Sequence, residues 1–91
     1  MAARSIPFTA TQGQYLAFIH PYRTRHQRAP AERDFQTFFR VTPPTVHRMV
    51  VTLHARGLIA RVPGQPRSIT LLVPPHQLPP LQSIKTPLTR Y

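Results

Sequence analysis

The chain has 91 residues and a formal charge of +10, from 12 Lys and Arg against 2 Asp and Glu, so we expect one small domain with a polyanionic partner. Without Cys, the composition excludes disulfides and thiolate chemistry, and no apolar run approaches the roughly 20 residues of a membrane-spanning helix. Glu32 and Asp34 are the only carboxylates in the side chains, which disfavours acid/base catalysis and metal-dependent hydrolysis, so we predict no enzyme, no metal and no cofactor.

The first predicted helix begins at Thr9, which has the capping-box spacing to Gln12. Pro21 lacks a backbone N–H and should kink or end this helix. We therefore expect a helix over about residues 10–20, with a bent continuation to about Arg25 as the alternative. Its apolar side chains recur at helical spacing and predict a buried face; they are Tyr15, Leu16, Phe18, Ile19 and Tyr22.

A basic run follows and leads into a second, short helix. The run contains Arg23, Arg25 and Arg28, which can contact phosphates beside a neighbouring helix or form a solvated loop, and the sequence leaves both readings open. The next helix is predicted over residues 31–40. Its first turn holds the two carboxylates, which suit the helix dipole, and its buried face consists of Phe35, Phe38 and Phe39.

The third predicted helix has the clearest boundaries, between Thr42 and Gly57. The hydroxyl of Thr42 can cap it by accepting a backbone N–H, and Pro43 suits the first helical position. Gly57 followed by Leu58 is typical of a Schellman C-terminus. Positions i, i+3, i+4 and i+7 form one buried stripe, made of Val46, Met49, Val50 and Leu53.

The opposite face of this helix is small, polar and basic, without a carboxylate. Arg48 can donate two hydrogen bonds to a guanine edge, and Thr45 or Val51 can contact a thymine methyl group. The face therefore suits the major groove of DNA, although a solvated amphipathic helix has the same pattern. His54 lies two turns from His47, about 10 Å by helix rise, which is too far to share a metal ion. We expect His47 to bind a base or a phosphate instead.

After the third helix the pattern predicts a hairpin. Two strands are expected at residues 58–62 and 67–73, joined by a turn at residues 63–66. Ile69, Leu71 and Val73 share one face of the second strand. Arg61 and Arg67 lie on either side of the tip, where a wing can reach the backbone or the minor groove of DNA.

The C-terminal segment is rich in proline. Residues 74–81 are expected to be extended and the last ten residues disordered. Leu78 and Leu81 can either fold back onto the core or contact a partner, and the sequence does not decide between the two.

Residues 9–73 resemble the winged helix-turn-helix domain of LexA-type repressors, including small stand-alone regulators of LexA or MarR type. The likeness is carried by residues 9–19 (TATQGQYLAFI), 29–32 (APAE), 41–46 (VTPPTV), 56–59 (RGLI) and 67–69 (RSI). It implies an α+β fold of three helices followed by a two-stranded hairpin, the wing. It also implies sequence-specific binding to double-stranded DNA and control of transcription.

In LexA-type domains the cap and first outward turns of the third helix read bases, at the positions held here by Thr42, Pro44, Thr45, His47 and Arg48. His47 and Arg48 stand where the repressors often hold acidic residues, so the operator does not carry over. The self-cleaving domain of LexA repressors has no counterpart in this sequence, and cleavage-triggered derepression is therefore not implied.

These patterns divide the chain into an irregular segment at residues 1–8, a winged helix-turn-helix at residues 9–73 and a Pro-rich tail at residues 74–91. The expected base-reading residues are Pro44, Thr45, His47 and Arg48. Contacts to the DNA backbone are expected from Arg23, Arg25, Arg28, Arg40, Thr42, Arg56, Arg61, Arg67 and Ser68.

The alternative function is a winged-helix adaptor that binds RNA or a protein partner, through the basic face or through residues 74–91. We expect a cytoplasmic, nucleoid-associated protein that does not bind membranes. The sequence leaves open a monomer or a weak homodimer.

Overall fold

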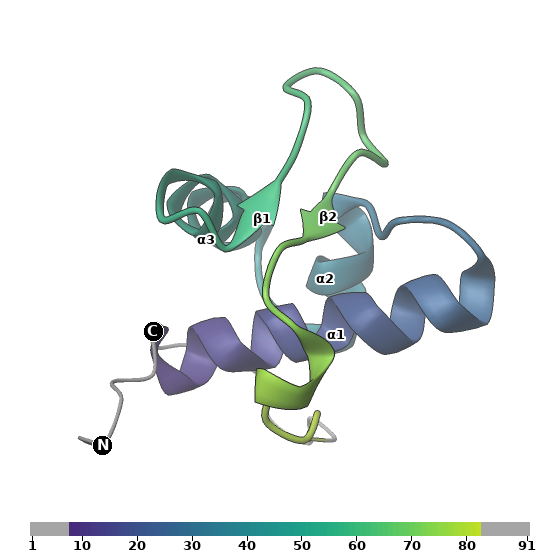
Figure 1. Ribbon diagram of the computed structural model, residues 1–91. Helices are drawn as coiled ribbons and strands as arrows, with labels where there is room; N and C mark the ends of the chain where they lie inside the picture. The colour runs from purple at the N-terminus through teal and green to yellow at the C-terminus, as the bar shows by residue number, and fades with distance from the viewer. Residues whose placement is uncertain (1–7, 83–91) are drawn as a thin grey trace.

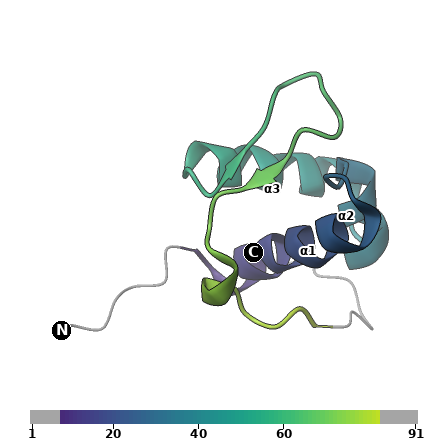
Figure 2. The same ribbon diagram turned by 45° about the vertical axis from the view of Figure 1, so that its right-hand side comes forward.

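The computed structural model describes residues 8–82. Within this range the elements follow one another as α1 (Ala10–His26), α2 (Glu32–Phe39), α3 (Pro43–Ala55), β1 (Ile59–Ala60), β2 (Thr70–Leu71) and a short 3-10 helix, η1 (Pro75–Gln77). The loop between β1 and β2 extends away from the helices, and α1 lies on the opposite side of the molecule (Figures 1 and 2). The described residues thus confirm the predicted winged helix, with its helices followed by an antiparallel hairpin.

The start of α1 is the predicted capping box. Thr9 Oγ1 accepts the Gln12 N–H at 3.1 Å, and Gln12 Oε1 accepts the Thr9 N–H at 3.0 Å. The helix runs through Pro21 to His26, so the expected end near residue 20 is wrong and the alternative end near Arg25 agrees with the structure. Pro21 removes a single backbone donor, whereas the turn after it places the Tyr22 hydroxyl where it accepts a hydrogen bond from Arg67 Nη1 at 3.2 Å. We attribute the continuation to this tertiary contact.

The two ends of α3 differ in how well the sequence anticipated them. The predicted Schellman end is confirmed, because Leu58 N–H donates to the Leu53 carbonyl and Gly57 N–H to the His54 carbonyl, each at 3.0 Å, with Gly57 at φ 74°. The predicted cap by the Thr42 hydroxyl is wrong. Within the described chain that hydroxyl caps no backbone N–H of α3, because it pairs at 2.9 Å with the hydroxyl of Thr45.

The core lies between the helices and is closed by the hairpin. Tyr15 of α1 stacks on Phe39 of α2 with ring centroids 4.5 Å apart, and Phe18 packs on Phe38 at 4.9 Å. The predicted buried stripes are confirmed, with Phe38 and Tyr22 only half-buried. Side chains that are at most 1% exposed include Tyr15, Leu16, Ile19, Phe35, Phe39, Val46, Val50, Leu53 and Ile59.

The wing has shorter strands than the sequence predicts. β1 and β2 pair only through Ile59 with Leu71 and Ala60 with Thr70. Ile69 and Val73 are buried as expected, and Leu71 is half-buried. The ladder does not extend to the tip because a side chain takes over there: Ser68 Oγ accepts the Val62 N–H at 2.8 Å.

The segment that follows the wing folds back onto α1. Residues 75–77 form η1 instead of the expected extended chain, and Leu78 and Leu81 are half-buried against the core. The side-chain amide of Gln14 donates to the Pro80 carbonyl and accepts the Gln82 N–H, both at 2.9 Å. The expectations for residues 1–7 and 83–91 lie outside the described residues.

Candidate nucleic-acid interface

The outward face of α3 is accessible along its length. Its buried stripe points into the core, which leaves Pro44, His47 and Arg48 exposed. Val51, an apolar residue, is 43% exposed on the same face. Thr45 is half-buried, and its hydroxyl is paired with Thr42. A rigid helix therefore presents basic, small and apolar side chains together, which is the combination that can contact base edges and methyl groups.

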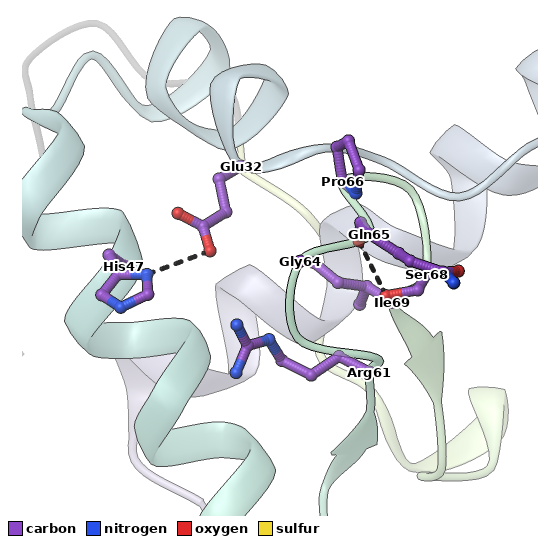
Figure 3. Close-up of a pocket in the computed structure, with 8 residues that line it drawn as sticks. All are labelled: Glu32, His47, Arg61, Gly64, Gln65, Pro66, Ser68 and Ile69. Atoms are coloured by element: carbon purple, nitrogen blue, oxygen red, sulfur yellow. Dashed lines mark hydrogen bonds and ion pairs between the residues drawn. The ribbon is translucent and has the colours of Figure 1, made fainter.

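A hollow of about 390 Å³ separates α3 from the wing. His47 enters it from α3, Glu32 from the first turn of α2 and Arg61 from the end of β1 (Figure 3). His47 Nδ1 lies 3.2 Å from Glu32 Oε2, and the side chains are 60% and 32% exposed. The remaining lining residues belong to the wing: Gly64, Gln65, Pro66, Ser68 and Ile69. The fold thus brings His47 together with two charged residues from other elements.

Arg67 fixes the base of the wing to the helices. Its Nη1 donates to the Ala29 carbonyl at 2.9 Å, to Asp34 Oδ2 at 3.0 Å and to the Tyr22 hydroxyl at 3.2 Å. The same carboxylate oxygen accepts the Ala31 N–H at 2.8 Å at the start of α2. One guanidinium nitrogen therefore joins the wing to the end of α1, the following loop and α2.

Ionisation of this cluster is coupled to its hydrogen bonds. Burial acts to raise the pKa of the Asp34 carboxyl, but hydrogen bonds from Ala31, Tyr22 and Arg67 outweigh it, so the pKa of Asp34 lies below its ordinary value. The hydrogen bond to Tyr22, and then the Asp34 carboxylate, raise the pKa of Arg67. Both groups are therefore held in their charged forms at neutral pH.

Ser68 organises the tip of the wing. Besides accepting the Val62 N–H, its hydroxyl lies 2.9 Å from the Gln65 carbonyl and 3.1 Å from the Val62 carbonyl. The turn itself closes with a 3.0 Å hydrogen bond from Gln65 N–H to the Val62 carbonyl, and Gly64 takes the positive φ of 86° that the turn requires. Ser68 thus contributes to the shape of the tip.

The other predicted arginines lie at two separate places. Arg40 and Arg56 are exposed at the two ends of α3. Arg23, Arg25 and Arg28 are exposed at the end of α1 and in the loop after it. Arg25 lines a second hollow, of about 380 Å³, together with Phe18, Phe38 and Leu81, and that hollow shares none of the residues around His47. The structure therefore does not join Arg25 to the hollow between α3 and the wing.

Two curated proteins are similar to this chain, whereas no protein-family model matches it. The LexA repressor of Thermosipho melanesiensis (strain DSM 12029 / CIP 104789 / BI429) is 36% identical over 64 residues, which are 70% of this chain and 32% of that protein. The LexA repressor of Thermosipho africanus (strain TCF52B) is 36% identical over 67 residues, which are 74% of this chain and 34% of that protein. The fold of this chain has three helices followed by the hairpin that forms the wing. The chain carries a LexA-type winged helix-turn-helix domain.

This chain spans about a third of the length of the curated relatives it matches. The LexA-type assignment therefore concerns the winged helix-turn-helix. In residues 8–82 no three His, Asp or Glu side chains are grouped so that they could hold a metal ion. None of the helices in that same range is both long and apolar enough to cross a membrane.

Sequence reasoning missed three functions of side chains in this LexA-type domain. Glu32 was assigned only to the helix dipole, although it also pairs with His47. Asp34 and Tyr22 were not connected with the wing, although both bind Arg67. The composition contained a signal for these pairs. With only two carboxylates and a large excess of arginine, each carboxylate can be expected to pair with a basic side chain.

Proposed function

We propose that this LexA-type domain binds double-stranded DNA with sequence preference and regulates transcription, with α3 in the major groove. The observation that carries the proposal is the exposed face of α3, which is basic, small and free of carboxylates. An α-helix fits the major groove, where each base pair offers a distinct pattern of donors and acceptors. The similarity to two proteins named LexA repressor supports the same function.

Arg48 is the strongest base-reading residue in this proposal, because its guanidinium can bind the O6 and N7 atoms of guanine together. His47 contacts a neighbouring base edge from the wing side of α3. Pro44 and Thr45 provide apolar contacts near the start of the helix. The Thr45 methyl group suits thymine while its hydroxyl stays paired with Thr42 at 2.9 Å.

Contacts to the DNA backbone come from residues that flank α3. Arg40 and Thr42 lie before it, Arg56 lies at its end and Arg61 approaches from the wing. Such contacts fix the position of the helix without reading sequence. Arg23, Arg25 and Arg28 form a separate basic group that contacts phosphates only where the DNA continues past the end of α1.

Arg67 and Ser68 have a different part in the proposal from the one that the sequence suggested. Each already makes several hydrogen bonds within the domain, Arg67 to α1 and α2 and Ser68 to the tip. We assign both residues to positioning the wing. Arg61 is then the residue of the wing that contacts phosphates.

The adaptor hypothesis has no specific observation in its favour. Its two routes were the basic face and residues 74–91. In the described part of the second route, Leu78 and Leu81 pack against the domain and Gln14 holds the backbone of Pro80 and Gln82. The two similar proteins are named as repressors.

A binding selection from a random duplex-DNA library tests the proposal, repeated at low and near-physiological salt. We expect one enriched motif that survives the higher salt, and a palindromic motif would also indicate a dimer. Binding without a motif that collapses as salt rises would contradict sequence preference. The Arg48→Ala variant should lose the motif. Arg33→Ala, which removes the same charge at an exposed position of α2, should keep it.

A further inference from the structure

The hydrogen bond between His47 and Glu32 determines which hydrogen bond a neutral His47 ring can offer to a ligand. A carboxylate has only acceptor atoms, so the Nδ1 atom that lies 3.2 Å from Glu32 Oε2 carries the proton of this contact. In a neutral imidazole the second nitrogen then has no proton and is an acceptor. Glu32 on α2 therefore determines that Nε2, on the opposite side of the His47 ring, acts as a hydrogen-bond acceptor.

The second nitrogen is accessible to a ligand. The His47 side chain is 60% exposed, and its Nε2 points away from Glu32 in the close-up of the hollow (Figure 3). The charged side chains around the hollow in the described residues are Glu32 from α2 and Arg61 from the wing.

We propose that Glu32 is a positioning residue for sequence preference: it makes His47 an acceptor, and α3 thereby prefers a base pair that presents an amino group to His47. In the major groove adenine N6 and cytosine N4 are such groups, whereas guanine and thymine offer only hydrogen-bond acceptors there, so the preference concerns which base of the pair faces His47. The inference rests on the proposed binding of α3 to DNA. It assigns a specificity role to a residue of α2 that lies outside the base-reading helix.

The proton position can be measured without DNA. Nitrogen-15 NMR of the free protein at about pH 8, where imidazole side chains are ordinarily neutral, distinguishes the two ring nitrogens. We expect the wild-type His47 ring to carry its proton on Nδ1. In Glu32→Asp, which keeps the charge but shortens the side chain, and in Glu32→Gln, whose amide can donate or accept, the proton should move at least partly to Nε2.

The sequence preference is then measured by binding selection on the same variants. We expect the wild type to prefer adenine or cytosine over guanine at one position by about five- to tenfold, as one good base contact supplies. Both Glu32 variants should reduce that preference to less than about twofold and keep the rest of the motif. His54→Asn is the matched control, since His54 is exposed on the same helix and outside the hollow, and it should change neither result.

The outcomes separate this inference from the function on which it rests. A wild-type ring protonated on Nε2, or on both nitrogens, would overturn the inference. So would Glu32 variants that keep the wild-type preference at every position. If the wild type enriches no motif at all while the ring carries its proton on Nδ1, the proposed function fails and the inference about base preference fails with it. Thermal unfolding of each variant establishes that the loss of preference occurs in a folded protein.

Discussion

Arg48 is the side chain whose removal should change sequence preference most. It is exposed on α3, and a guanidinium that binds guanine at two atoms discriminates against other bases by about 1–3 kcal/mol. We expect Arg48→Ala to lose about that much affinity for the selected site and to lose preference at one base pair. Equilibrium titration of the selected and scrambled duplexes measures both. Equal weakening on the two duplexes would contradict a base-reading role.

Asp34 should give the stability of the domain a distinct acid dependence. Its pKa is lowered in the folded protein, where burial is outweighed by bonds from Ala31, Tyr22 and Arg67. A lowered folded pKa stabilises the protein fully above the unfolded value, near 3.9 for Asp, and this stability is lost as pH falls through the folded value.

We therefore expect Asp34→Asn to lower the free energy of unfolding by about 1–3 kcal/mol at neutral pH, because the bonds that it weakens involve a charge. The difference from wild type should shrink as pH falls below about 4. Urea unfolding at several pH values measures it. A difference that stays constant into the acid range would show that the carboxylate charge is not what stabilises the fold.

Residue pairs of this kind could not be predicted from the sequence. Glu32 and His47 are 15 positions apart, and Asp34 and Arg67 are 33 apart. Periodicity describes neighbours within one helix, whereas these contacts depend on how two elements pack. The exposure of His47 and Arg48 was predictable, because the buried stripe of their own helix already fixes which side faces outward.

At the scale of elements, local signals were reliable at two helix ends, although the predicted Thr42 cap was lost to the hydroxyl of Thr45. The capping box of Thr9 and the Schellman end at Gly57 involve residues close together in sequence, and both formed as predicted. The end of α1 was misjudged because a tertiary contact decides it: beyond Pro21, the Tyr22 hydroxyl accepts a hydrogen bond from Arg67. The strand lengths were misjudged because Ser68 replaces backbone pairing within the wing.

The attachment of the wing depends on Arg67 and can be separated from phosphate contact at Arg61. We expect Arg67→Ala to lower the free energy of unfolding measurably, since it leaves the Asp34 carboxylate without its guanidinium partner. Arg61→Ala should leave stability nearly unchanged and reduce the salt slope of DNA binding by about one. Urea unfolding and salt titrations of the two variants measure this contrast. If instead Arg67→Ala reduced the salt slope and Arg61→Ala reduced stability, Arg67 would be the residue of the wing that contacts phosphate.

The segment after the wing should stabilise the domain. Leu78 and Leu81 are half-buried against the core, and burial of apolar surface contributes roughly 25 cal/mol per Å². We expect the double variant Leu78→Ala, Leu81→Ala to lose about 1–3 kcal/mol of unfolding free energy, and to keep the DNA motif. Gln77→Ala, at an exposed position of η1, is the control for thermal unfolding. If the double variant kept its stability but lost binding to RNA or to a protein partner, the adaptor hypothesis would be supported instead.

For the whole molecule, the charge of +10 should dominate affinity while α3 sets preference. Each neutralised phosphate contributes about 0.9 to the slope of log affinity against log salt. If Arg40, Arg56 and Arg61 act with one or two further contacts, the slope is about −4, and affinity falls roughly 10²- to 10³-fold between about 50 and 200 mM salt.

The ratio of affinities for selected and scrambled duplexes should change far less over that range, because base contacts release few counterions. Fluorescence anisotropy titrations at four salt concentrations measure the slope and the ratio in one experiment. Convergence of the two duplexes at the higher salt would mean that the charge alone binds DNA. A persistent ratio would mean that the base contacts of α3 contribute their own free energy, which the field of the whole protein cannot supply.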